Sequence, residues 1–231
     1  MRVVTIALLA FCMILAGHAH AAADREYVLI SGGVSLHAWE KFKSEPHDHW
    51  WMNFIRAARI RIQEIQMREP DAQITWFVYR PSYIARGRQD RRDYISLINS
   101  VRDAFGVKLI YFDRTPELIN YLNQGQPRDR VKICNFEFFG HSNKACWMFD
   151  YSNNLDSASK SWLHEKEFGQ INRGIFTRDA FVKSWGCHTG ESMSKRWRSA
   201  IGIPMWGAVG KTQYMTEQLP ELSSANGRWV K

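Results

Sequence analysis

The sequence predicts an α/β protein: a three-layer sandwich whose mostly parallel sheet of about six strands lies between helices. Two observations predict it. Short apolar runs rich in β-branched and aromatic residues alternate with stretches of helical period, which is typical of parallel strands joined by crossover helices. In addition, 45% of the residues are hydrophobic and ten are tryptophan, enough for one full core.

The first 22 residues have the three parts of a secretory signal peptide. A positive start at Arg2 is followed by an apolar run from Val3 to Gly17. Ala19 and Ala21 then stand at the −3 and −1 positions of a cleavage site. The run is shorter than the roughly 20 residues that span a bilayer, although an uncleaved anchor is the alternative. We therefore expect a single exported domain over residues 23–231, periplasmic or secreted, without stable membrane insertion after cleavage.

The first half of the domain predicts three strands and three helices. The strands are runs of β-branched and aromatic residues, and the helices carry apolar residues three and four positions apart. Gly32, Pro81 and Pro116 mark boundaries, because glycine and proline interrupt regular structure while proline also suits the first position of a helix. In chain order we expect a strand at 27–31, a helix at 50–67, a strand at 74–79, a helix at 90–105, a strand at 107–112 and a helix at 115–123.

The second half continues the alternation. We expect a long strand at 131–139, a short helix near 165–171, a strand at 180–185, a helix at 191–200 and a strand at 204–209. In open parallel sheets, ligands bind beyond the carboxyl ends of the strands. His141 and Cys187 each follow the end of a predicted strand, which makes them candidate functional residues.

Charge and composition narrow the classes of partner. The formal net charge is +8, but the basic residues are scattered over predicted helices and no nucleic-acid-binding motif occurs. We therefore expect neither a nucleic-acid partner nor a cofactor. After Cys12 leaves with the signal, three cysteines remain, and an odd number leaves at least one thiol free. Cys134 and Cys146 are candidates for a disulfide that spares Cys187; alternatively, all three are small buried residues.

Cys187 and His141 together suggest nucleophilic catalysis. Cys187 precedes the helix expected from Glu191, and a helix N-terminus lowers the pKa of a nearby thiol. Gly186 and Gly190 allow a tight turn around it. A thiol nucleophile needs an imidazole within hydrogen-bond reach, and His141 would meet this requirement if the two strands are neighbours.

With these residues, the chain resembles the caspase-like cysteine peptidases of clan CD, which include caspases, metacaspases, legumain, gingipains and clostripain. The resemblance covers roughly residues 107–212. It rests on a helix at 115–122, an apolar strand that ends in His141, and a second apolar strand that ends in Cys187. The 46 residues from the histidine to the cysteine are close to the spacing of about 50 in caspases.

The resemblance implies that His141 is the general base, that Cys187 is the nucleophile, and that the backbone N–H groups of Ser142 and Cys187 form the oxyanion hole. Ser142 departs from the family, which usually has glycine there, and a turn with φ > 0 would put the substitution in doubt. The family also suggests substrate contacts from the loops after the first and last strands. The candidates lie in the segments 31–37 and 206–214, and include Ser31, Gly32, Gly33, Trp206 and Gly207.

The sequence therefore favours an exported peptidase that cleaves a peptide or protein substrate. One alternative is a non-catalytic binding domain of the same fold. Another is a serine esterase, because Ser142 follows a strand as in a Gly-x-Ser-x-Gly elbow, although Lys144 replaces the second glycine. A metal site built from His37 and the segment 47–49 is a weaker alternative, since their spacing matches no metal motif and we expect no metal.

Overall fold

The computed structural model describes residues 24–41, 48, 50–151, 161–214 and 217–231. Its central sheet has five strands in the order β3-β2-β1-β4-β8, and every neighbouring pair is parallel. This confirms the predicted α/β class and the parallel sheet. The strands are β1 (Arg25–Ser31), β2 (Gln73–Tyr79), β3 (Lys108–Phe112), β4 (Lys132–Phe139) and β8 (Phe176–Ser184). The proposed signal peptide lies outside the described residues.

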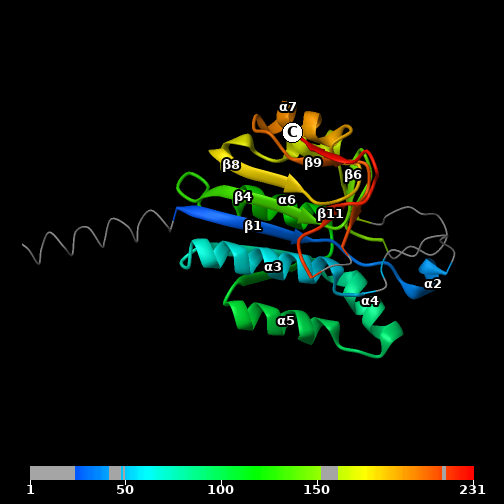
Figure 1. Ribbon diagram of the computed structural model, residues 1–231. Helices are drawn as coiled ribbons and strands as arrows, with labels where there is room; N and C mark the ends of the chain where they lie inside the picture. Colours follow the sequence, from blue (N-terminus) through cyan, green and yellow to red (C-terminus); the bar gives the residue numbers. More distant parts are fainter. Residues whose placement is uncertain (1–23, 42–47, 49, 152–160, 215–216) are drawn as a thin grey trace, which may run out of the picture.

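Helices cover both faces of the sheet; Figure 1 shows α3 beside β1, with α5 on the outer side of α3. One face carries α3 (Asn53–Arg68), α4 (Arg80–Asp90) and α5 (Tyr94–Phe105). The other face carries α6 (Thr115–Gln124), α7 (Met193–Ile201) and the 3-10 turns η1 (Glu165–Gln170) and η2 (Arg173–Ile175). A four-residue helix, α2 (His37–Glu40), follows β1.

The expected sixth strand at 204–209 is reduced to a single bridge. Trp206 lies parallel to β8, accepting a hydrogen bond from Ser184 and donating one to Val182, both at 2.8 Å. The chain then turns away from the sheet. Here β9 (Gly207–Val209) pairs antiparallel with β12 (Arg228–Val230), and β10 (Thr212–Gln213) pairs with β11 (Glu221–Leu222). Residues 207–209 of the expected sixth strand therefore pair with the C-terminal segment rather than with the central sheet.

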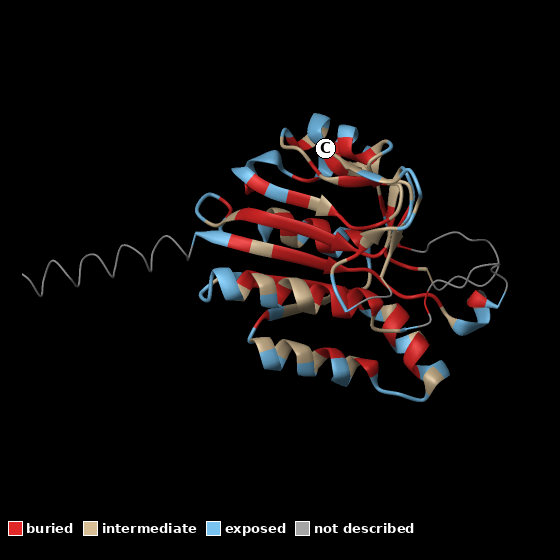
Figure 2. Cartoon of the chain, in the orientation of Figure 1, coloured by how far each residue is buried: buried red, intermediate tan, exposed pale blue. Residues whose placement is uncertain are grey.

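The helical pattern places α3 and most of α5 correctly. On α3, the apolar residues spaced three and four apart, Phe54, Ala58, Ile62 and Ile65, are all buried. Figure 2 shows buried residues along β1, β4 and the inner side of α3. On α5, Tyr94 and Ile98 are buried, but Leu97, which the same spacing would place on the inner face, is 42% exposed. Only a narrow stripe of α5 is covered, because it lies outside α3 and α4 and touches the sheet mainly at β3.

An aromatic cluster supports the end of β4. The short strands β5 (His141–Ser142), β6 (Cys146–Met148) and β7 (Trp162–His164) form an antiparallel sheet just beyond it. Trp147 is fully buried, stacks on Phe138 and donates from its indole N–H to the Ser184 hydroxyl at 3.0 Å. This packing fixes the segment after β4 against the end of β8.

The expected disulfide between Cys134 and Cys146 is wrong, because both are free thiols. Cys134 lies near the start of β4, which continues for five more residues to Phe139, whereas Cys146 lies in β6 beyond its far end. At about 3.3 Å per residue, this distance exceeds the 7 Å limit between bridged Cα atoms. In the part of the chain that is described, no helix is long and apolar enough to cross a bilayer.

Candidate functional site

His141 and Cys187 leave the sheet at the same level. Strands β4 and β8 are parallel neighbours, with Phe138 paired to Ser184. His141 and Cys187 each lie three residues beyond this pair. The backbone N–H of Trp185 donates to the Phe138 carbonyl at 2.9 Å and extends the pairing toward the site. The prediction that these residues emerge at one edge of the sheet is therefore confirmed.

Both residues line a cavity of about 370 Å³ at this edge. Ser142, Asp48, Thr212 and Tyr214 contribute to the same cavity. The strand order reverses between β1 and β4, because the chain proceeds outward from β1 through β2 to β3 and then crosses back to β4 on the other side of β1. The carboxyl end of β4, which His141 follows, therefore borders the point of reversal. Ligand sites in parallel sheets favour such a position.

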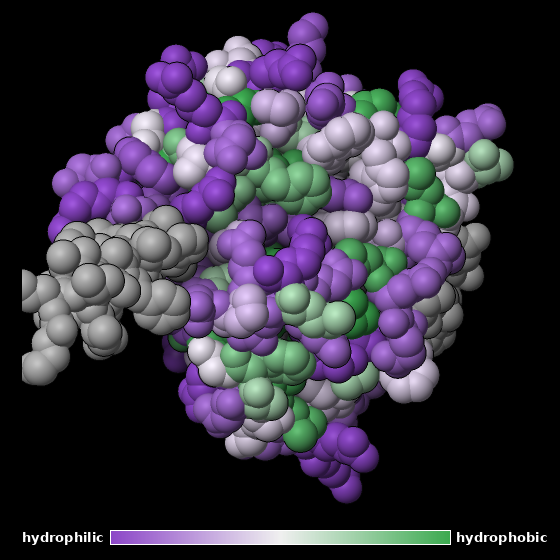
Figure 3. Space-filling view, turned by 60° about the vertical axis from the view of Figure 1, so that its left-hand side comes forward, coloured by the Kyte–Doolittle hydropathy of each residue, from purple (hydrophilic) through white to green (hydrophobic). Residues whose placement is uncertain are grey.

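A larger hollow of about 480 Å³ lies toward the opposite end of the sheet, between the start of β1 and the end of α3. Two of its arginines are already paired, Arg25 with Asp179 and Arg61 with Glu137. Figure 3, which turns this side of the molecule forward, shows hydrophilic and hydrophobic residues interspersed. This hollow lacks the combination of nucleophile and base found at the other edge, so the smaller cavity is the candidate site.

Asp48 is the residue of the site that the sequence did not reveal. Its Oδ2 atom lies 2.7 Å from His141 Nε2 and accepts the backbone N–H of Ser35 at 2.6 Å. The carboxylate is 2% exposed. His141 is further confined by an edge-on contact with the Phe54 ring and by stacking on Tyr151 at 4.1 Å between ring centroids. The imidazole is thus held in one orientation, with Nε2 facing a carboxylate.

Cys187 is partly exposed, and its sulfur is directed to β10. The backbone N–H of Thr212 donates to Cys187 Sγ at 3.3 Å. Among the described residues, all hydrogen-bond partners of this sulfur belong to Thr212. The helix that follows Cys187, α7, begins at Met193 rather than at the expected Glu191.

The loops after β4 and β8 are in close contact. The Ser142 hydroxyl donates to the Cys187 carbonyl at 2.7 Å. A Cβ atom on Gly186 would overlap the Ser142 hydroxyl and approach the Gly140 carbonyl to 2.9 Å, so this position requires glycine. After Cys187, the chain turns sharply at His188, whose φ of 63° is unusual for a residue with a side chain.

The backbone N–H groups of Ser142 and Cys187 are the two expected oxyanion donors. The Asn143 N–H donates to the Cys146 carbonyl, so Asn143 and Cys146 form a hydrogen-bonded pair. In an antiparallel ladder, hydrogen-bonded pairs alternate with pairs that are not hydrogen-bonded. The neighbouring pair of Ser142 and Trp147 is therefore not hydrogen-bonded, and the Ser142 N–H points away from β6. Within the described residues, the Cys187 N–H donates to no backbone carbonyl. Ser142 does not have a positive φ, so a serine is tolerated where the resembled family has glycine.

The segments expected to contact substrate only partly reach the cavity. None of the candidates Ser31, Gly32, Gly33, Trp206 and Gly207 lines the cavity. The first three are buried, and the Ser31 hydroxyl and the N–H groups of both glycines are used in hydrogen bonds to neighbouring segments. Trp206 and Gly207 pair with β8 and β12. The end of the candidate segment 206–214 does line the cavity, from Lys211 to Tyr214.

The metal alternative is not supported by the residues that can be placed. His47 and His49 lie outside the described part of the chain, while His37 and Asp48 bind Asp90 and His141, respectively. Over the described ranges, no group of three potential metal ligands occurs.

Comparisons with protein-family models, curated proteins and solved structures give no match. The function must therefore be argued from the site itself.

Proposed function

We propose that the protein is an exported cysteine peptidase of caspase-like fold, in which Cys187 is the nucleophile and His141 the general base. The observation that carries the proposal is the placement of a thiol and an imidazole at equivalent positions beyond two adjacent parallel strands, on one cavity. The hydrogen bond from His141 to the buried Asp48 supports it further, because a catalytic imidazole is commonly oriented by a carboxylate.

The proposed reaction follows from this arrangement. With Nε2–H donated to Asp48, the lone pair on Nδ1 of His141 accepts the thiol proton. The Cys187 sulfur then attacks the substrate carbonyl carbon, and the negative oxygen binds the N–H groups of Ser142 and Cys187. Protonated His141 donates its proton to the leaving amine as the C–N bond breaks. Water hydrolyses the resulting thioester, with His141 again acting as base, and regenerates the thiol.

The resting thiol hydrogen-bonds to Thr212 rather than to His141. Catalytic contacts are often long in the absence of substrate and shorten in the complex, so this arrangement is compatible with the proposal. The same Thr212 N–H supports the thiolate after proton transfer. The proposed substrate is a peptide or protein, and the binding surface includes the segment 212–214 that lines the cavity.

The proposal is tested by alkylation with iodoacetamide, followed by peptide mapping of each cysteine. Cys146 is a matched internal control, because it is also partly buried, and burial together with Glu167 and Glu165 raises the pKa of its thiol. We expect Cys187 to react at least about tenfold faster than Cys146 near pH 7, and His141→Ala to remove this difference.

The parallel assay is cleavage of a peptide library by the wild type, Cys187→Ala and His141→Ala. Activity lost in both variants supports the proposal. A Cys187 that reacts no faster than a free thiol, with no effect of His141→Ala, would rule out the dyad. Activated Cys187 without peptide cleavage would favour a non-catalytic domain that binds peptides and has lost turnover.

A further inference from the structure

Arg86 is a buried cation close to the site but not part of its cavity. It lies on α4 and is 1% exposed. Arginine is seldom fully buried without partners, because an unpaired charge in the interior is very costly. The contacts of the Arg86 guanidinium therefore indicate which part of the structure this residue holds in place.

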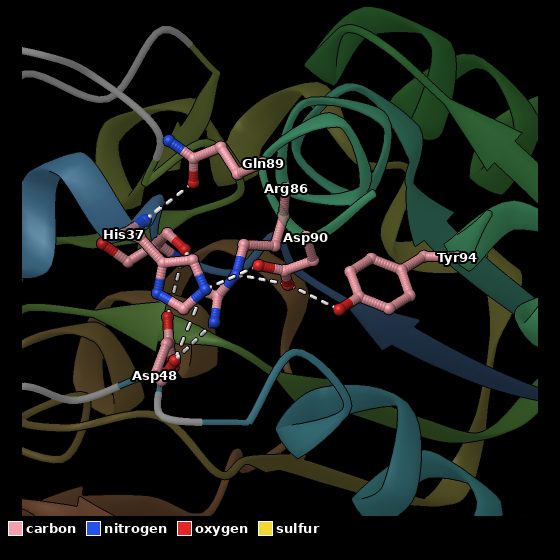
Figure 4. Close-up of polar contacts among 7 residues, drawn as sticks. His37, Asp48, Arg86, Gln89, Asp90 and Tyr94 are labelled. Atoms are coloured by element: carbon pink, nitrogen blue, oxygen red, sulfur yellow. Dashed lines mark hydrogen bonds and ion pairs between the residues drawn. The ribbon is translucent and has the colours of Figure 1, made fainter. Parts of the chain in front are cut away.

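The guanidinium joins three segments, as Figure 4 shows. Nη1 donates to the Ser35 carbonyl at 2.7 Å, and both Nη atoms donate to the Asp48 carbonyl at 3.2 Å. Nε donates to Asp90 Oδ2 at 2.9 Å. The planar guanidinium of arginine can donate to several acceptors in fixed directions at once, which the single ammonium group of lysine does not reproduce.

Asp90 is itself fixed as the counter-ion. It accepts the Tyr94 hydroxyl, and its Oδ1 atom lies 2.6 Å from His37 Nε2. Burial raises the pKa of this carboxyl, but hydrogen bonds from Tyr94, Arg86 and His37 outweigh burial and lower the pKa from its ordinary value. Asp90 is therefore ionised at neutral pH and balances the charge of Arg86.

Asp48 is held from two sides. Its carboxylate accepts the Ser35 N–H and binds His141, while its carbonyl accepts both Nη groups of Arg86. Its own N–H donates to Glu40 at 3.4 Å. Arg86 thus binds the backbone of the two residues that determine where the carboxylate lies, Ser35 and Asp48.

We propose that Arg86 is a positioning residue of this site: it acts through Asp48 to fix the orientation of the His141 imidazole. The inference rests on the proposed function, in which His141 must present Nδ1 to Cys187. Arg86 contacts neither of these two side chains, so its effect is indirect. A change of about 1 Å in such a position can alter a rate by about 10²-fold.

The test uses the full chain and four variants: Arg86→Met, Arg86→Lys, Asp48→Asn and the double variant Arg86→Met/Asp48→Asn. Arg88→Met is the matched control, because Arg88 is exposed on the same helix. Two readouts are measured on each folded protein: the rate of Cys187 alkylation from pH 5 to 9, and the imidazole ¹⁵N shifts of His141, which report its tautomer. The other titratable groups on the cavity, Tyr151, His188, Lys211 and Tyr214, are unchanged in every variant.

We expect Arg86→Met to slow Cys187 alkylation at pH 7 by about 10²-fold and to replace the single Nε2–H tautomer of His141 with a mixture. Arg86→Lys gives an intermediate loss, and Arg88→Met stays within about twofold of the wild type. The double variant is no slower than Asp48→Asn, because both changes act through one residue.

The inference would be overturned if folded Arg86→Met kept the wild-type tautomer and pH profile. If Arg86→Met does not fold, the same result in folded Arg86→Lys would overturn it. Full additivity with Asp48→Asn would overturn it as well. A wild-type Cys187 that reacts no faster than Cys146 would instead overturn the proposed function, while the ¹⁵N spectrum would still show whether Arg86 fixes His141.

Discussion

The Ser142 hydroxyl donates a hydrogen bond to the Cys187 carbonyl, 2.7 Å away and 45 residues along the chain. This contact joins the loop after β4 to the loop after β8. It thereby fixes the relative position of the two peptide groups that we propose as oxyanion donors, those of Ser142 and Cys187. In this arrangement the proton of the serine hydroxyl is directed to a backbone carbonyl.

Replacement of Ser142 separates the peptidase from the serine esterase. Ser142→Ala removes one hydrogen bond, so we expect a loss of about 1 kcal/mol in unfolding free energy and reduced but measurable activity. Urea denaturation and hydrolysis of an activated ester measure the two effects. Ester hydrolysis that disappears in Ser142→Ala and persists in Cys187→Ala would identify Ser142 as the nucleophile.

The close approach at Gly186 predicts a large effect of a single methyl group. In Gly186→Ala the new Cβ overlaps the Ser142 hydroxyl, so we expect about 1–3 kcal/mol of destabilisation and slower alkylation of Cys187. Gly169→Ala is the control, because a Cβ there meets nothing within 4 Å. Thermal or urea unfolding of both variants checks the prediction, which requires the first to be clearly less stable than the second.

Cys134 predicts a decline in stability at alkaline pH. Burial raises the pKa of its thiol to about 11, from an ordinary value of 9.0. Between these values, the folded protein keeps a proton that the unfolded chain releases, so the unfolding free energy falls as the pH rises from about 9 to 11. Urea denaturation at several pH values should show a steeper fall for the wild type than for Cys134→Ala. Equal slopes would mean that this thiol titrates normally.

The proposed export predicts a processed N-terminus. Mass spectrometry of protein made in a secreting host should find a chain that has lost its first 21 or 22 residues, cut just after the small residues at Ala19 and Ala21. Ala21→Arg places a large charged residue at the −1 position and should leave the precursor uncut. If full-length protein predominates in the wild type, the N-terminal segment acts as an uncleaved anchor or is not an export signal.

The sequence was sufficient to predict the parallel sheet and the positions of His141 and Cys187. Both lie just beyond long apolar runs, and a strand end is one of the few places where local sequence implies tertiary position. Asp48 was not predictable in this way. It reaches His141 across 93 residues from a segment without a periodic pattern, and its role depends on contacts with Ser35 and Arg86.

The predictions of a disulfide and of a sixth strand failed because they, too, depend on contacts between distant parts of the chain. Cys134 and Cys146 are close in sequence, but an intervening extended strand keeps them apart. The segment 204–209 has the composition of a strand, but its residues from Gly207 pair with β12, which the local sequence did not reveal. Of the candidate segment 206–214, only the part from Lys211 onward reaches the cavity, because the residues before it pair with β8 and β12.

The site is assembled from residues 48, 141, 187 and 212, which no short fragment of the chain contains together. Pairing of β4 with β8 closes a loop of several tens of residues, and such non-local contacts form slowly. Under the proposed function, a nascent chain, or one threaded unfolded through a membrane pore, would therefore carry an ordinary cysteine at position 187. The proposed nucleophile would become reactive only once these distant segments have come together in the fold.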